Sequence, residues 1–290
     1  GLDPGTTYYF QAVSTDNSGN SSNSIGASFT TLGTPMTDTD GDGVADANDQ
    51  CPGYDDATDL DADGVPDGCD DSDGDGLSDA VEGSEDTDRD GTPDYMDMDA
   101  DGDGVNDEIE HAAPNNGDGN SDGIPDRSQN RVASLMDHDA KDYITFESPE
   151  GTALTGVQAA VNPSPGDMPE GSTLSSGLFD FTIHGVGAGG SVQMTLYLPP
   201  GTKPDSYLKY GRTPDNIEDH WYEFVYDGVT GAQINENKIT LYFVDANEGD
   251  DILTQDGMII DIGGPMVDNM VTTPSGDGGC FIGCMLTGVD

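Results

Sequence analysis

The alternation of apolar and polar positions divides this 290-residue chain into three regions. Residues 6–13 and 24–31 alternate with a period of two around a turn at residues 16–20, which predicts two β-strands. Residues 142–266 repeat short apolar runs between turn sequences. Residues 38–141 lie between these regions and contain almost no apolar side chains. The pattern predicts β structure at both ends and a middle segment that lacks a hydrophobic core.

The C-terminal region is expected to contain eight short strands. They are predicted at about residues 143–148, 153–161, 179–186, 191–198, 206–210, 220–227, 237–245 and 257–262. Turn sequences such as Pro199-Pro200-Gly201 separate them. Eight short strands at this spacing favour an antiparallel β-sandwich or jelly roll. No helix longer than two turns is predicted, and no run approaches the roughly 18 apolar residues that a membrane helix requires.

The polar positions of the middle segment repeat a fixed phrase, Asp-x-Asp-x-Asp-Gly-apolar-x-Asp, usually followed by another acidic residue three positions later. Oxygen ligands at positions one, three and five, with further carboxylates, form the cage that a hard cation such as Ca²⁺ prefers. The glycine at position six allows a positive φ where the chain turns back. A solvated acidic linker is the alternative, but a linker needs neither this spacing nor the periodic glycine. The phrase therefore predicts calcium-binding loops.

The predicted metal ligands occupy positions one, three, five, seven, nine and twelve of each copy, and position seven offers its backbone carbonyl. In the first three copies they are Asp38, Asp40, Asp42, Val44, Asp46, Asp49, Asp59, Asp61, Asp63, Val65, Asp67, Asp70, Asp71, Asp73, Asp75, Leu77, Asp79 and Glu82. In the next two they are Asp86, Asp88, Asp90, Thr92, Asp94, Asp97, Asp99, Asp101, Asp103, Val105, Asp107 and Glu110. The looser sixth copy supplies Asp118, Asn120, Asp122, Ile124 and Asp126. The fourth and sixth copies depart from the phrase at Thr92, Asn120 and Gln129.

The charge of the chain agrees with cation binding. Asp and Glu number 58 against 8 Lys and Arg, which gives a formal charge of -50 at pH 7. More than half of the acidic residues lie between residues 38 and 139. Such a field excludes nucleic acid and anionic membrane surfaces as partners and favours divalent cations. Bound metal would take the place of a hydrophobic core, so the segment is expected to unfold when the metal is removed.

The spacing of the copies discriminates between calcium-binding motifs. The copies begin 12 to 21 residues apart and are interrupted by prolines, which leaves no room for the paired helices of an EF-hand or a dockerin-like module. The glycine-rich nonapeptide of β-roll proteins is absent. The phrases Asn48-Asp49-Gln50-Cys51-Pro52 and Asp67-Gly68-Cys69-Asp70 strengthen a different resemblance. Residues 38–141 resemble thrombospondin type 3 repeats, and this resemblance implies a disulfide between Cys51 and Cys69.

The first 32 residues carry a second resemblance. Leu2, Pro4, Gly5, Thr6 and Tyr8 match in spacing the tyrosine corner at the end of a fibronectin type III domain. Such a domain has about seven strands, and only the last two are represented here. Two isolated strands cannot bury their own aromatic residues. Either the upstream part is missing, or a neighbouring chain supplies or accepts the missing strands. A short linker is expected at residues 33–37.

Residues 142–266 carry the third resemblance, together with the end of the aspartate segment. The phrases at residues 124–126, 132–135, 143–149, 220–224 and 249–251 resemble a bacterial surface module, the choice-of-anchor domain of the U type. This resemblance implies a location and no activity. In the tail, residues 267–290, a glycine run precedes Cys280 and Cys284. A local disulfide, attachment of a lipid or another group at Cys280, and contact with a neighbouring subunit are all compatible with this tail.

A search for catalytic motifs yields no candidate. The chain contains no His-Glu-x-x-His, Gly-x-Ser-x-Gly or Walker A phrase, and its four histidines lie where surface or core roles are expected. Trp221, Tyr222 and Tyr226 could form a carbohydrate-stacking stripe, although the first two point to opposite faces of a strand. No catalytic residue is predicted, and the chain is not expected to be an enzyme.

These observations predict a mainly β extracellular protein whose calcium-filled rod separates an N-terminal hairpin from a C-terminal sandwich. Calcium and a disulfide indicate a secreted or cell-surface location. The chain begins at Gly1 without an initiator methionine or signal peptide, so a processed form or fragment is expected. The expected function is that of a rigid spacer and a subunit of a surface fibre or adhesin. Its expected partners are calcium ions, further copies of the chain and other surface proteins. The alternative is a non-catalytic, carbohydrate-binding module of a larger secreted enzyme.

Overall fold

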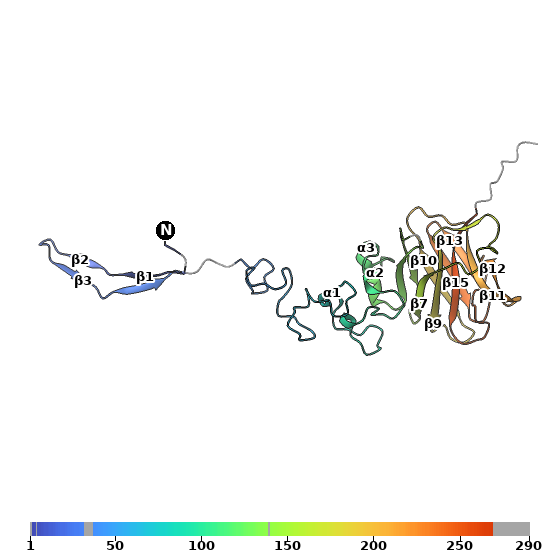
Figure 1. The fold of residues 1–290 in the computed structure, drawn as a ribbon, viewed down its shortest axis with the longest axis horizontal. Coiled ribbons are helices and arrows are strands. Elements are labelled where there is room, and N and C mark those ends of the chain that lie inside the picture. The colour runs from blue at the N-terminus through green and yellow to red at the C-terminus, as the bar shows by residue number, and fades with distance from the viewer. Residues whose placement is uncertain (1, 4, 32–36, 139, 269–290) are drawn as a thin grey trace, which may run out of the picture. The chain divides into compact units, whose positions relative to one another are not determined.

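The computed structural model describes residues 2–3, 5–31, 37–138 and 140–268, and these residues are mainly β with antiparallel sheets (Figure 1). The chain divides into two compact units, Gly1–Ser84 and Glu85–Asp290. The boundary between the units lies inside the aspartate-rich segment, between its third and fourth copies. Most of the predicted linker, and the tail with Cys280 and Cys284, lie outside the described residues.

The first unit begins with a β-hairpin in two parts. The paired strands are β1 (Thr7–Phe10) with β4 (Ala27–Thr30) and β2 (Val13–Thr15) with β3 (Ser21–Asn23). The hydroxyl oxygen of Tyr8 accepts a hydrogen bond from the Asp3 amide at 2.6 Å, the kind of contact that a tyrosine corner makes. Tyr9 is 84% exposed and Ile25 is 94% exposed. The hairpin thus leaves most of its apolar surface uncovered within this unit.

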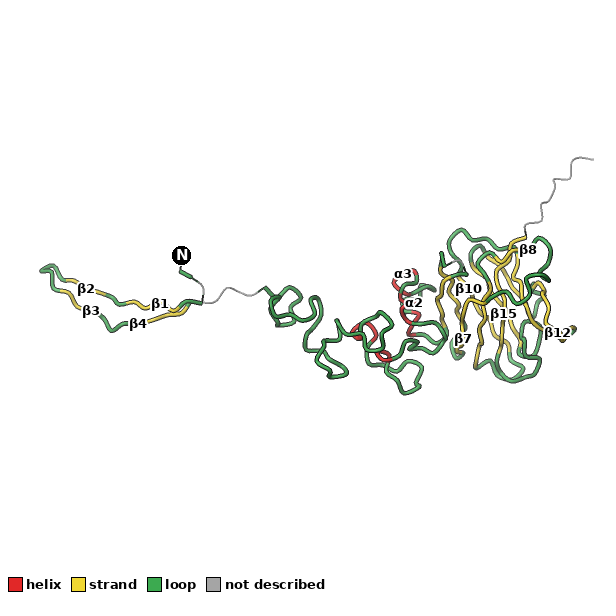
Figure 2. Tube along the Cα trace, viewed as in Figure 1, coloured by secondary structure: helices red, strands yellow, loops and turns green. Residues whose placement is uncertain are grey.

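The aspartate-rich segment is built of loops, as Figure 2 shows, with short helical turns between them. Among the described residues no helix exceeds five residues. The turns are α1 (Asp79–Glu82), η1 (Asp94–Met96), α2 (Asp107–His111), α3 (Pro114–Gly117) and η2 (Asp126–Ser128). Four of these five begin at the position-nine aspartate of a copy, and a carboxylate at a helix N-terminus interacts favourably with the helix dipole.

The second unit contains two sheets whose named strands all pair antiparallel. The order of the five-stranded sheet is β13 (Gly231–Asn235), β14 (Lys238–Val244), β10 (Ser191–Tyr197), β6 (Tyr143–Glu147) and β5 (Val132–Met136). The order of the six-stranded sheet is β12 (Asn216–Glu223), β11 (Ser206–Thr213), β15 (Ile259–Asp268), β9 (Leu178–His184) and β7 (Ala153–Ala160), with β8 (Ser172–Leu174) paired to β15.

Side chains from both sheets share one core. The ring of Phe146 on β6 lies 5.2 Å from that of Phe179 on β9, and the rings of Phe181 and Phe243 join β9 to β14 at 6.4 Å. Alternate residues of β14 point into this core, where Ile239, Leu241 and Phe243 are buried. A smaller cluster of Leu178, Leu208, Trp221 and Met266 is also formed by strands of the six-stranded sheet.

The eight predicted strands of this region are present, with shifted ends. The sequence did not predict β5, β8 or β13. β13 is the edge strand of its sheet and has only two apolar residues that pack against the core, Ala232 and Ile234, so its alternation is too short to predict a strand. β5 follows directly on the aspartate-rich segment and was assigned to it. Its buried residues 132–135 show that the end of that segment is part of the sheet.

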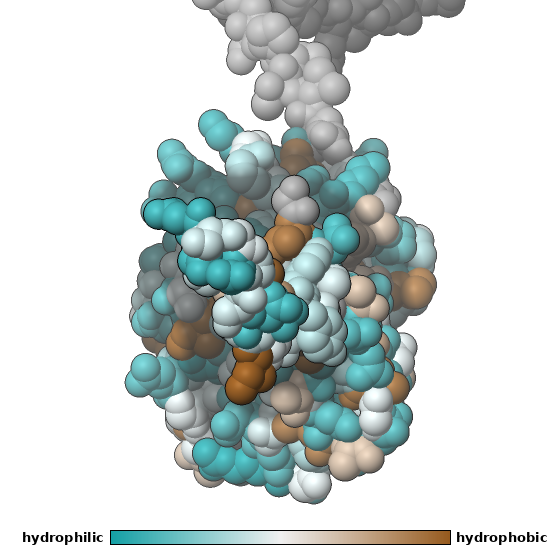
Figure 3. All heavy atoms as spheres, turned by 90° about the vertical axis from the view of Figure 1, so that its left-hand side faces the viewer, coloured by the Kyte–Doolittle hydropathy of each residue, from teal (hydrophilic) through white to brown (hydrophobic). Residues whose placement is uncertain are grey.

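Within the described residues, no helix has the length and apolar composition needed to cross a lipid bilayer. The face of the molecule drawn in Figure 3 is mostly hydrophilic, with apolar side chains scattered among polar ones.

Candidate metal centres

The aspartates at positions one, three and five lie together in five of the six copies. In each of these copies three carboxylates offer oxygen atoms that lie within 4.8 Å of one another. The five triplets are Asp38, Asp40 and Asp42; Asp59, Asp61 and Asp63; Asp71, Asp73 and Asp75; Asp86, Asp88 and Asp90; and Asp99, Asp101 and Asp103. Three like charges at this separation repel one another, so the arrangement calls for a cation between them.

The loop backbone holds one oxygen of these carboxylates in place, as the fifth copy shows. The Gly104 amide donates to Asp99 Oδ2 at 3.0 Å, the Asp103 amide to Asp101 Oδ1 at 3.1 Å, and the Val105 amide to Asp103 Oδ1 at 2.8 Å. The bond from the position-seven amide to the position-five carboxylate recurs in all six copies. The position-five carboxylates of the third and fifth copies are oriented through Oδ1 while Oδ2 has no partner. In the first copy, by contrast, backbone amides bond both oxygens of all three triplet aspartates.

The glycine at position six adopts the predicted conformation. Its φ lies between 92° and 106° in every copy, at Gly43, Gly64, Gly76, Gly91, Gly104 and Gly123. A residue with a Cβ rarely adopts this backbone conformation. The prediction that this glycine permits the turn is confirmed.

The position-nine aspartate has a role that the sequence did not predict. It is predicted to be a metal ligand, and in the structure one of its oxygens also accepts a hydrogen bond from the position-two amide of its own copy. The distances are 2.6 to 3.1 Å for Asp46, Asp67, Asp79, Asp94, Asp107 and Asp126. In three copies the other oxygen accepts from a Ser or Thr hydroxyl at position two. These six carboxylates close their loops and thereby hold the triplets in shape.

Several carboxylate oxygens that the backbone leaves unused are buried and have no hydrogen-bond partner. In the fifth copy they are Asp99 Oδ1, Asp103 Oδ2 and the position-twelve Glu110 Oε2. The second and third copies show the same at Asp59 Oδ1, Asp73 Oδ2 and Asp75 Oδ2. Leaving a buried charged oxygen without a partner costs more than about 1–3 kcal/mol. A bound cation is the one partner that would satisfy several of these oxygens at once.

The fifth copy is the most deeply buried of the candidate centres. Asp101, Asp103 and Glu110 are each at most 2% exposed. Burial, reinforced by the neighbouring carboxylates, raises the pKa of all three side chains well above the ordinary range. Burial also raises the pKa of the position-twelve residues Asp49, Asp70 and Asp97 in other copies. These loops hold negative charge at high cost unless a positive charge accompanies it.

The fifth copy is also part of the β domain. Val105 at position seven is 3% exposed and belongs to the core shared by the two sheets. The Val157 amide donates to the Asp103 carbonyl at 2.9 Å. A Cβ on Gly104 would lie 2.9 Å from the backbone of Gly156, so the loop packs directly on β7. The Ser134 amide of β5 donates to Glu110 Oε1 at 2.8 Å. The geometry of this centre therefore depends on the sheets, and the sheets contact it in return.

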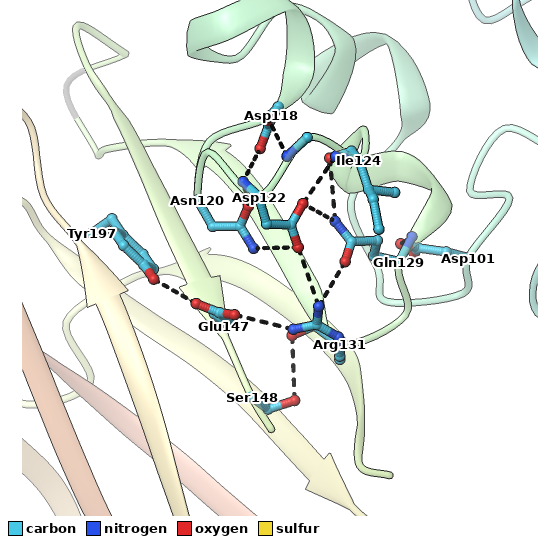
Figure 4. A network of polar contacts seen from close by, with 11 residues as sticks. Asp101, Asp118, Asn120, Asp122, Ile124, Gln129, Arg131, Glu147, Ser148 and Tyr197 are labelled. Atoms are coloured by element: carbon cyan, nitrogen blue, oxygen red, sulfur yellow. Dashed lines mark hydrogen bonds and ion pairs between the residues drawn. The ribbon is translucent and has the colours of Figure 1, made fainter. Parts of the chain in front are cut away.

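The sixth copy, drawn in Figure 4, has a basic residue and an amide side chain as partners. Arg131 forms ion pairs with Asp122 Oδ2 at 3.2 Å and with Glu147 Oε1 of β6 at 3.1 Å. The Gln129 side-chain amide donates to Asp122 Oδ1 at 3.3 Å and to the Ile124 carbonyl at 3.2 Å. The predicted ligands at positions five and seven thus already have a guanidinium and an amide as partners. Arg131 therefore supplies positive charge to the carboxylate at position five of this copy.

Cys51 and Cys69 form a disulfide, the pairing that the thrombospondin resemblance implies. The bond joins the end of the first copy to the end of the second, and Cys51 is fully buried. The amides of Gln50 and Cys51 both donate to Asp56 at 3.0 Å. The disulfide and this carboxylate fix the connection between two candidate centres. The second pairing considered, Cys280 with Cys284, lies outside the described residues.

The aromatic residues of β12 and of the segment that follows it do not form one exposed stripe. Trp221 is 9% exposed, lies in the smaller apolar cluster, and donates its indole N–H to the Ser164 carbonyl at 2.9 Å. Tyr222 packs against the main core on the other face of the strand. Tyr226 lies 4.5 Å, ring to ring, from Tyr242. The three rings therefore offer no shared surface for stacking a sugar.

No family model, no curated protein and no solved structure matches this chain. The three family resemblances rest on the sequence motifs quoted above.

Proposed function

We propose that this chain is an extracellular, calcium-stabilised structural protein of a bacterial or archaeal surface. Residues 38–141 act as thrombospondin type 3-like repeats that form a stiff spacer. The spacer follows a fibronectin type III-like hairpin and precedes a β-sandwich of the choice-of-anchor U type. One observation carries the proposal: five aspartate triplets are held by their own backbone with oxygen atoms within 4.8 Å of one another.

The chemistry of the triplets favours Ca²⁺ among the common metal ions. Every triplet offers carboxylate oxygens only, which suits a hard cation and disfavours Zn²⁺, whose sites use sulfur and nitrogen. Position-seven carbonyls and position-twelve carboxylates can bring the ligand number to the six to eight that Ca²⁺ accepts. Mg²⁺ demands near-ideal octahedral geometry and keeps several waters, so a loop crowded with carboxylates suits it less well.

The mechanism is passive. Without a cation the carboxylates repel one another, and the first three copies have few apolar side chains to hold them together. Because the complete ligand set exists only in the folded loop, the free energy of ion binding is free energy of folding. Calcium therefore converts a self-repelling chain into an ordered, protease-resistant spacer, and the disulfide adds one covalent restraint.

The location and the partners follow from the same features. Loops of this kind need the calcium concentration of an extracellular space, and disulfides persist in oxidising compartments. The exposed Tyr9, Phe10 and Ile25 of the hairpin support pairing with further β-strands. Those strands belong to a neighbouring chain or to preceding residues of a longer one. In the first case the protein is a fibre subunit or adhesin that associates with itself or with other surface proteins.

Calcium binding is tested by equilibrium dialysis of the chelator-treated chain, followed by circular dichroism. At least five ions should bind, and the spectrum of the loops should change on addition of calcium but much less on addition of Mg²⁺. The double variant Asp61→Ala/Asp63→Ala should bind one ion fewer. Glu150→Ala/Glu170→Ala, which removes two exposed acids outside the loops, should bind as many as the parent chain. An unchanged spectrum with and without calcium would refute the proposal.

Self-association is tested separately by sedimentation and electron microscopy of the calcium-loaded chain. Fibres that soften or dissolve with a chelator support the polymer. A discrete monomer would refute the polymer and leave the calcium spacer standing.

A further inference from the structure

The core of the β domain contains a lysine whose side chain is entirely buried. Lys209 of β11 and Asp261 of β15 are both 0% exposed and form an ion pair. β11 and β15 are neighbouring strands, and Lys209 lies opposite Gly263, two residues from Asp261 on the same face. Desolvating two charges costs several kcal/mol per ion, and a fully buried pair often contributes less stability than an apolar pair would. The packing of the two sheets alone does not require this pair.

The surroundings of the pair are organised around the Lys209 nitrogen. Lys209 Nζ lies 5.4 and 5.3 Å from the ring centroids of Phe224 and Phe243, and it donates to the Gly249 carbonyl. The Tyr207 hydroxyl donates to Asp261 Oδ2 at 3.1 Å. A Cβ on Gly263 would collide with the Tyr207 ring, so the missing side chain at Gly263 makes room for this hydroxyl. The amine and the carboxyl are thus held against each other in an apolar enclosure.

A second carboxyl completes the cluster. The Asp251 side chain occupies the space that a Cβ on Gly211 would need, two residues from Lys209 on the same face of β11. Asp251 Oδ1 is buried and has no hydrogen-bond partner. Burial raises the pKa of Asp251 to about 7, against the opposing effect of Lys209. One amine therefore shares the enclosure with two carboxyls, and one of those carboxyls can carry a proton at neutral pH.

We infer that Lys209 and Asp261 are joined by an intramolecular isopeptide bond that the folded domain forms by itself. One proton first passes from the Lys209 ammonium to the Asp261 carboxylate, which leaves a neutral amine beside a neutral carboxyl. The amine Nζ attacks Asp261 Cγ, and the new C–N bond replaces one C–O bond. Asp251 in its ionised form accepts the second proton from the nitrogen and passes it to the departing oxygen, which leaves as one molecule of water, as a general acid–base group placed close by allows. Tyr207 donates a hydrogen bond to the oxygen that remains on the carbon.

Three physical reasons favour this reaction here. Holding the two groups in contact makes the attack effectively unimolecular. The enclosure replaces a costly buried ion pair with a neutral amide, and the Gly249 carbonyl remains available to accept the N–H of that amide. The exclusion of water from a fully buried site opposes the reverse hydrolysis. No oxidant, enzyme or cofactor is needed, because the groups that react and the group that transfers the proton are all present.

The test is the intact mass of the purified full chain after reduction of its disulfides. A cross-linked chain weighs about 18 Da less than its sequence requires, since one water is lost. Proteolysis should give a branched peptide that contains Lys209 and Asp261. A mass equal to that of the sequence would overturn the inference, and this measurement on the unaltered chain does not depend on whether any variant folds.

Variants assign the roles. Lys209→Met should restore the full mass, whereas Lys203→Met, which replaces an exposed lysine, should keep the deficit. A deficit that persists in Lys209→Met would place the lost water elsewhere and overturn the assignment. Asp251→Asn should leave most molecules uncross-linked after refolding, with Trp221 fluorescence showing that the domain has folded. Full cross-linking in Asp251→Asn at the rate of the parent chain would remove Asp251 from the reaction.

Discussion

Replacing Asp103 with asparagine should have opposite effects on stability with and without calcium. Asp103 Oδ1 accepts the Val105 amide at 2.8 Å, and its Oδ2 is buried without a partner. Asparagine preserves the size of the side chain and keeps an oxygen that can accept the hydrogen bond from the Val105 amide. It removes one negative charge from the fifth triplet. Only the proposed ion requires that charge. The substitution therefore separates a metal ligand from a carboxylate that serves the fold alone.

The expected changes in the free energy of unfolding follow from ion binding in calcium and from the burial of Asp103 in chelator. At a calcium concentration 100-fold above its dissociation constant, one bound ion stabilises the folded state by about 2.7 kcal/mol. A hundredfold loss of affinity in Asp103→Asn would cancel about 2 kcal/mol of that stabilisation. In excess chelator the same substitution should increase the free energy of unfolding. Asp103 is then a buried charge repelled by Asp99 and Asp107, and removing it should stabilise the domain by roughly 1 kcal/mol or more.

The assay is urea unfolding followed by tryptophan fluorescence. The chain has a single tryptophan, Trp221, which lies in an apolar cluster of the β domain, so its signal reports on the second unit. Parent chain, Asp103→Asn and the control Glu150→Gln are compared in calcium and in chelator. Glu150 is exposed and lies outside the loops, so the control should change both curves by less than about 0.5 kcal/mol. Equal destabilisation of Asp103→Asn in both conditions would refute the reasoning.

Three further outcomes are expected. Arg131→Gln should destabilise the second unit by about 1–2 kcal/mol in the same urea assay, because it leaves the half-buried Asp122 and Glu147 without their cation. The control Arg212→Gln breaks an exposed ion pair and should destabilise the unit by less than about 0.5 kcal/mol. The rate of cross-linking after refolding should rise between about pH 6 and pH 8, because Asp251 accepts a proton only when ionised and its pKa is about 7; a rate independent of pH would contradict the role of Asp251. Reduction of Cys51–Cys69 should destabilise the first unit by about 3 kcal/mol, seen as faster cleavage by an aspartate-specific protease between residues 51 and 69 with no change at residues 85–110.

The loops were the part of the structure most open to prediction from sequence. Each triplet and its glycine lie within six consecutive residues, so their geometry is local and can be predicted from the residue types. The same holds for strands such as β14, whose burial follows strict alternation. The hairpin was predicted as two strands, and the structure divides it into two pairs of shorter strands. The hydrogen bond between position two and the position-nine aspartate was not predicted, because the spacing of that carboxylate suits a metal ligand equally well.

Contacts between distant segments were beyond prediction from sequence. Arg131 follows the sixth copy as an ordinary basic residue, and only the position of β6 brings Glu147 to it. In the sequence Lys209 is a single charged residue within a predicted strand. The residues next to it in the sequence do not indicate that β15 places Asp261 beside it. β5 was missed because the aspartate phrase just before it suggested that the loops continued. In each case the decisive partner lies on another strand, and pairing of strands is set by the whole fold.

The burial of Val105 in the sheet core has a consequence for when the domain can fold. The fifth loop places Val105 between the sheets and, through Asp103, accepts the Val157 amide of β7, so the core is complete only when this loop is closed. Closing it without a cation forces several carboxylates into a dry site. Under the proposed extracellular function, a chain made where calcium is scarce is therefore expected to be less stable and easier to hold unfolded during export. Binding of the ion in a calcium-rich space would then stabilise the completed core.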